Sequence, residues 1–155
     1  MLTKSQKLLF YLIKETGKID DKTVLAKLQY FSDFIHFAFH NKPISEETII
    51  YTKQKMGPLA RSLSGDLEVL KKAGYIKEVS KYHYSQAKDV KPKLSKDELK
   101  TIRYVVQKYS RLGYKELINI CHKQVPYLSA QDGGVIELFT AYNLIDEYED
   151  YKHLN

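Results

Sequence analysis

The residues of this chain best suited to metal chemistry are two histidines, His36 and His40, four positions apart in a helical stretch. That spacing places both imidazoles on one face of a helix, and Asp33 lies one turn earlier. The residues between them are Phe-Ala-Phe, so no catalytic glutamate follows the first histidine. A third ligand would have to come from elsewhere, and the pair Cys121-His122 is the nearest candidate. We therefore favour partly buried or interface histidines and expect no metal.

Other signatures of catalysis are missing from the sequence. It contains no CxxC pair, no glycine-rich phosphate loop and no GxSxG elbow. The single cysteine, Cys121, follows the apolar pattern Leu-Ile-Asn-Ile and is expected to pack as a small hydrophobic residue. No run approaches the roughly 20 apolar residues that a bilayer span needs. We expect a non-enzymatic, cytoplasmic protein with no cofactor and no membrane contact.

The positive charge of the chain is concentrated in one segment. Residues 53–93 contain ten lysines and arginines against four acidic residues, so this segment alone accounts for the net charge of +6. A basic face favours a polyanion or an acidic protein surface as the partner. The alternative is a solvated lysine-rich face that binds nothing.

Apolar periodicity predicts the elements that position these residues. A first helix spans residues 3–16, with Thr3 and Gln6 as a capping box. A second helix, over about residues 21–40, has too many apolar positions for one stripe and should be the central, mostly buried helix. The β-branched cluster 48–52 then favours a strand, although Ser45-Glu46-Glu47 would also cap a helix.

A Gly-Pro corner follows that strand. Gly57 and Pro58 should start a helix that Gly74 ends. One apolar stripe supports this helix, formed by Leu59, Leu63, Leu67 and Leu70. Residues 75–79 and 82–86 then predict a β-hairpin.

The C-terminal part is predicted to be helical. Ser95 and Glu98 form a capping box for a helix over residues 96–112, and a further helix spans residues 114–123. A last helix should begin at about Val135, after two glycines.

These elements predict an α+β fold that is mainly α-helical. A small antiparallel sheet of winged-helix-like type should lie between residues 49 and 86, followed by a helical C-terminal part. We expect a single domain over residues 1–155. Its parts would be an additional N-terminal helix (1–20), a helical and winged-helix-like core (21–90) and the C-terminal helices (95–155).

A winged helix would also suggest a nucleic-acid surface. Arg61 and Ser62 lie at the start of the leucine-striped helix, where a recognition helix would enter a DNA groove. The predicted hairpin would supply further contacts through Lys77, Lys81, Tyr82 and His83. Asp66 and Glu68 on the same helix argue against DNA, because they would repel phosphate.

With these residues in view, the chain resembles the SocA-like antitoxin family, which is also known as the Panacea domain. The resemblance covers residues 24–136. It rests on four ordered motifs, namely the helix Lys27-Leu28-Gln29-Tyr30-Phe31-Ser32-Asp33-Phe34-Ile35-His36-Phe37, the element Lys42-Pro43-Ile44, the corner Met56-Gly57-Pro58, and the exit Gly74-Tyr75-Ile76. Downstream matches include Leu94 to Leu99 and Pro126-Tyr127.

The resemblance implies a non-enzymatic antitoxin that binds and neutralises a cognate protein toxin. It also implies a Clp-type protease as a further candidate partner, because SocA acts as a proteolytic adaptor. Asp33 and His36 are polar on an apolar helix, so they indicate either partner contact or a buried hydrogen bond, and Arg61 and Ser62 complete the candidate partner site. The alternative hypothesis is a winged-helix transcriptional regulator that binds operator DNA.

Overall fold

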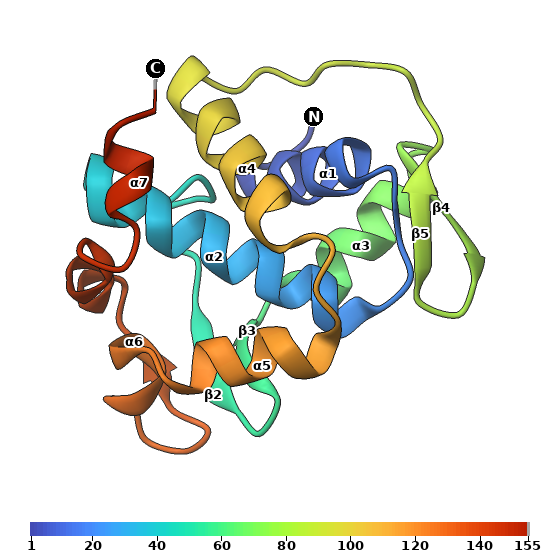
Figure 1. Ribbon diagram of the computed structural model, residues 1–155. Helices are drawn as coiled ribbons and strands as arrows, with labels where there is room; N and C mark the ends of the chain where they lie inside the picture. Colours follow the sequence, from blue (N-terminus) through green and yellow to red (C-terminus); the bar gives the residue numbers. More distant parts are fainter. Residues whose placement is uncertain (155) are drawn as a thin grey trace.

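The computed structural model describes residues 1–154, and it has the predicted α+β, mainly helical architecture (Figure 1). Its elements in chain order are α1 (Lys4–Thr16), β1 (Lys18–Ile19), α2 (Lys22–His40), β2 (Tyr51–Gln54), β3 (Gly57–Ala60), α3 (Leu63–Lys72), β4 (Ile76–Ser80), β5 (His83–Gln86), α4 (Lys96–Tyr109), α5 (Tyr114–His122), α6 (Val125–Leu128), β6 (Val135–Ile136), the 3-10 helix η1 (Leu138–Leu144) and α7 (Glu149–Lys152). None of the helices in this range is both long and apolar enough to span a membrane.

Helix α2 crosses the centre of the molecule, as its all-round apolar pattern predicts. Figure 1 shows α1 and α4 on one side of it and the β2–β3 hairpin with α5 on the other. It packs against α1, α4, α5, β3 and η1. Its rings Tyr30, Phe31 and Phe34 are fully buried, and Phe31 stacks on Tyr109 of α4 with ring centroids 4.2 Å apart.

Both predicted capping boxes are confirmed. Thr3 accepts a hydrogen bond from the backbone N–H of Gln6, whose side chain in turn accepts from the N–H of Thr3. Ser95 and Glu98 form the same reciprocal pair at the start of α4. The N-cap of α2 is Asp21, which accepts from the N–H of the residue two positions later.

The strands form two separate three-stranded sheets, with orders β1-β5-β4 and β3-β2-β6. The predicted hairpin is confirmed as β4–β5, and its turn contains Tyr82 in the left-handed region (φ 66°). The expectation that this hairpin shares a sheet with the strand before α3 is wrong. That strand, β2, pairs with β3 and β6, while β5 pairs with β1. Strand β1 has only two residues, so no pattern indicated it.

The Gly57-Pro58 corner does not start a helix, and this prediction is corrected. Both residues belong to β3, and Gly57 (φ 102°) follows the tight turn from β2. Strand β3 is at the edge of its sheet, where a proline whose missing N–H would point away from the partner strand is tolerated. Helix α3 begins only at Leu63. The other leucines of its predicted stripe, Leu67 and Leu70, are buried there, while Leu59 lies on β3.

The last predicted helix is also corrected. Val135 and Ile136 form β6, which pairs with Thr52 and Tyr51 of β2. The loop before β6 is fixed to the same strand, because Gly133 N–H donates to the carbonyl of Lys53 at 2.8 Å. Val135 and Ile136 are β-branched and lie beside the edge of β2 that β3 leaves unpaired, so they extend the sheet as a third strand. The chain then continues as η1 and α7.

Candidate partner-binding site

Asp33 forms buried hydrogen bonds and lies away from the surface. Its carboxylate accepts from the N–H and the hydroxyl of Ser45, at 2.8 and 2.7 Å, and from the hydroxyl of Tyr51 at 2.6 Å. Burial raises the pKa of Asp33 to about 6, although these donors act in the opposite direction. Asp33 thus ties the loop after α2 and the start of β2 to the central helix. Of its two expected roles, the structure shows the buried hydrogen bond.

His36 is likewise buried. Its Nδ1 lies 2.8 Å from the hydroxyl of Thr101, its ring stacks on His40 with centroids 4.3 Å apart, and its Nε2 has no hydrogen-bond partner among the described residues. Burial, followed by the neighbouring His40, lowers the pKa of His36 to about 4. His40 Nε2 lies 2.8 Å from the hydroxyl of Tyr151. The histidine pair is therefore part of the packing between α2, α4 and α7.

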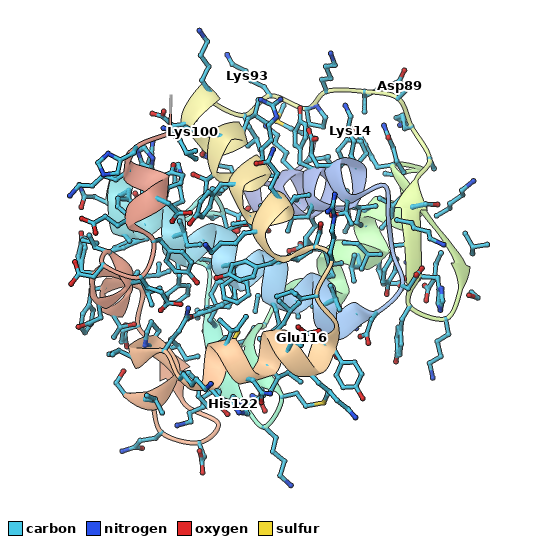
Figure 2. The ribbon with its side chains drawn as sticks, in the orientation of Figure 1. Lys14, Asp89, Lys93, Lys100, Glu116 and His122 are labelled. Carbon is cyan, nitrogen blue, oxygen red and sulfur yellow. The ribbon has the colours of Figure 1, made fainter. Side chains whose placement is uncertain are left out.

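The other proposed metal ligands lie elsewhere. Within residues 1–154, no group of three or more His, Cys, Asp or Glu residues is arranged to hold a metal ion. Cys121 is buried, and burial raises the pKa of its thiol to about 12. His122 lies at the end of α5 near the β2–β3 hairpin (Figure 2), with its Nε2 3.1 Å from the carbonyl oxygen of Lys55.

Arg61 and Ser62 form the connection between β3 and α3. The Arg61 side chain is exposed, and its backbone N–H donates to the carbonyl of Ile50 at 2.9 Å. Ser62 is at the N-cap of α3 but makes no side-chain cap, and its hydroxyl has no partner among the described residues. Arg61 is therefore available to a partner, whereas the Ser62 hydroxyl is not on the surface.

The basic segment does not form one face. Its first lysines, Lys53 and Lys55, lie on the β2–β3 hairpin. Its last residues, which include Asp89 and Lys93, lie on the loop between β5 and α4 at the opposite side of the molecule (Figure 2). Of the loop residues, Lys93 and Val90 accept hydrogen bonds through their carbonyls from Lys7 and Lys14 of α1. The prediction of a single concentrated basic face is therefore corrected.

The hairpin residues proposed for nucleic acid are all exposed, namely Lys77, Lys81, Tyr82 and His83. Acidic groups lie among them. Glu78 accepts from the N–H of Tyr82 and forms an ion pair with Lys71, and Asp20 lies 3.3 Å from the His83 ring nitrogen. The hairpin surface is thus of mixed charge, which weakens its attraction for phosphate.

A cleft of about 440 Å³ lies where the start of α2, the β2–β3 turn and the β4–β5 turn meet. We call it the Lys27 cleft and define it by Ala26, Lys27, Met56, Leu59, Leu63 and Tyr82. Met56 and Tyr82 expose 48% and 43% of their surface, so large apolar side chains flank it. Lys22 makes a cation–π contact with Tyr82, with its Nζ 5.7 Å from the ring centroid. The cleft therefore combines apolar walls with positive charge.

Lys27 is the functional candidate that the sequence patterns did not single out. It is 2% exposed, and its Nζ donates to the carbonyl oxygen of Pro58 at 2.9 Å. Burial lowers the pKa of its ammonium group to about 8. The sequence did contain a signal for it. Lys27 lies within a helix with too many apolar positions for one stripe, and the packing that buries such a helix buries the lysine as well.

The fold and this site describe a helical α+β domain that carries a cleft with apolar walls and a buried lysine. A family model for the SocA-like antitoxin, Panacea domain, matches residues 25–127. This is well over half of the chain, so the protein belongs to that family. No curated protein and no solved structure matches the chain significantly.

Proposed function

We propose that this protein is an antitoxin that binds and neutralises a cognate protein toxin without catalysing a reaction. The observation that carries the proposal is the family match over residues 25–127, which covers most of α2, the hairpins β2–β3 and β4–β5, and helices α3 to α5. A protein partner also accounts for the exposed apolar residues. Met56 and Tyr82 are exposed at the cleft. Elsewhere, α6 and η1 pack against each other and expose Leu128, Phe139 and Tyr142.

The direct test is rescue of growth. Each gene beside the one for this protein is expressed from an inducible promoter in a heterologous host, with and without this protein. We expect one product to stop growth, this protein to restore it, and the two to copurify. The proposal fails if no neighbouring product is toxic, or if a toxic one is neither neutralised nor bound.

Neutralisation could proceed by sequestration or by delivery to a Clp-type protease, and toxin turnover separates the two. After translation is stopped, the toxin is followed in cells with and without this protein, and with and without the protease. An adaptor shortens the lifetime of the toxin only when the protease is present. Sequestration leaves that lifetime unchanged or longer.

Operator DNA is a second candidate partner, favoured by one topological observation. Strand β1 lies between α1 and α2 and pairs with the hairpin that directly follows α3, an order of helices and strands that resembles a winged helix. The test is binding to the promoter fragment of its own gene over a range of salt concentrations. If the hairpin contacts DNA, exchanging Lys77 and Lys81 for Glu should abolish affinity while the fold is retained. Unchanged affinity excludes the hairpin as the contact.

A further inference from the structure

Lys27 forms no ion pair within the described part of the chain, and burial lowers its pKa although Cys121 and Asp21 nearby act to raise it. None of the ion pairs there, all within 4.0 Å, includes Lys27. Its ammonium group has three donors, and the bond to Pro58 is the one hydrogen bond that it makes to these residues. Charged side chains that are this deeply buried are usually paired. Lys27 is therefore a buried positive charge without the acidic group that usually pairs with such a charge.

The surroundings hold Lys27 against the wall of the cleft. A Cβ atom on Gly57 would lie 2.7 Å from Cε and 3.3 Å from Nζ of Lys27, so the glycine leaves the space that the lysine chain fills. The Pro58 carbonyl fixes the end of the same chain. The ammonium group is therefore positioned by the backbone of β3, and the cleft lies beside it.

The other charges of the cleft favour an anion. Lys22 and Lys55 line it together with Lys27, whereas Asp21 is the one acidic residue that does. The Asp21 carboxylate already accepts from the N–H of Thr23 as the cap of α2, at 2.7 Å. Three lysines against one carboxylate leave the cleft with a net positive charge that is complementary to an anion, while its walls suit an apolar chain.

We propose that the Lys27 cleft binds an acidic side chain of the partner protein, with the carboxylate paired to Lys27 and an adjoining apolar residue packed against Met56 and Tyr82. The inference rests on the proposed function, since it names the chemistry by which the toxin would be recognised. The carboxylate supplies the counter-ion that Lys27 lacks, and the partner surface covers the exposed side chains of Met56 and Tyr82.

The lowered pKa of Lys27 gives this site a distinct pH signature. A bound carboxylate favours the ammonium form and raises the pKa again. The free protein must therefore take up a proton on binding at pH values above about 8. Affinity for an acidic peptide should be flat between about pH 6, where the Glu side chain is ionised, and about pH 8, and it should fall as the pH rises further.

The experiment uses peptides, so that it does not depend on finding the toxin. The probes are acetyl-Leu-Glu-Leu-amide, its Gln analogue, and acetyl-Leu-Gln-Leu with a free C-terminus, each added to the full chain at up to about 10 mM and followed by amide NMR shifts. We expect the Glu peptide to shift the signals of Gly57 and Leu63, with an affinity at least about tenfold higher than that of the Gln peptide. Equal binding of these two peptides, or binding of the free C-terminus alone, overturns the proposal.

Matched variants connect the effect to the lysine. Lys27→Met keeps the length and apolar character of the chain, removes the charge, and should abolish both the preference for Glu and its pH dependence. Lys72→Met, an exposed exchange on α3, should change neither. Thermal unfolding checks that each variant is folded, and Lys27→Gln replaces Lys27→Met if the latter is not. A folded Lys27 variant that still prefers the Glu peptide refutes the site. If the peptides bind as expected but no toxin is found, the proposed function alone is in doubt.

Discussion

The buried polar residues of α2 act on stability in opposite directions as the pH changes. Asp33 has a pKa of about 6 in the folded protein against an ordinary value of 3.8, so its folded form binds a proton more readily than its unfolded form. His36 has a pKa of about 4 against 6.5, so here the unfolded form binds the proton more readily. As the pH falls from about 6 to about 4, Asp33 therefore adds stability and His36 removes it.

Asp33→Asn isolates one of these contributions. The exchange keeps the shape of the side chain and removes its titration. Relative to this variant, the wild-type protein should gain up to roughly 3 kcal/mol of unfolding free energy between about pH 7 and about pH 4, because each pKa unit corresponds to about 1.4 kcal/mol. Urea unfolding of both proteins at the two pH values measures the difference. A difference that stays constant with pH would show that the carboxyl group has an ordinary pKa in the folded protein.

At the scale of elements, helices with a local signal were predicted well and features that depend on distant pairing were not. The capping boxes of α1 and α4 lie within one helical turn, so the sequence alone indicates them. Strands β1 and β6 have two residues each, and both exist through pairing with distant strands. Lys27 was missed for the same reason, because its uncompensated charge depends on how β3 covers α2.

The Gly57 turn offers a prediction at this scale, with Gly65 as its control. Gly57→Ala should destabilise the fold by about 1–3 kcal/mol, because φ is 102° and the new Cβ would meet Lys27 at 2.7 Å. Gly65→Ala lies inside α3 with nothing within 4 Å of its Cβ, so it should stabilise by about 0.5–1 kcal/mol. Thermal or urea unfolding compares the two. Equal effects would mean that β3 is not held in this conformation.

At the scale of the molecule, α1 is the element whose role in the fold differs most from the one expected from the sequence. It lies outside the residues matched by the family model, yet Leu9, Phe10 and Leu12 are fully buried against the rest of the core. Helix α1 packs on α2, α3 and α4. It also carries polar links, since Ser5 and Gln6 donate to Asp66 at 2.8 and 3.1 Å. We therefore propose that residues 1–20 are integral to the domain and not an appended helix.

Removing α1 tests this proposal for the whole fold. A chain that begins at residue 18 loses the burial of the helix and leaves Asp66, 8% exposed, without the two donors from α1. We expect this truncated protein to lose cooperative unfolding and to bind a dye specific for exposed apolar surface. Leu9→Ala in the full chain provides the graded counterpart, with an expected loss of about 2–5 kcal/mol. Removing only Met1, which is exposed and precedes the capping box, should leave the unfolding transition nearly unchanged. If the truncated chain unfolds as cooperatively as the full one, α1 is dispensable, and the domain consists of the residues that follow it.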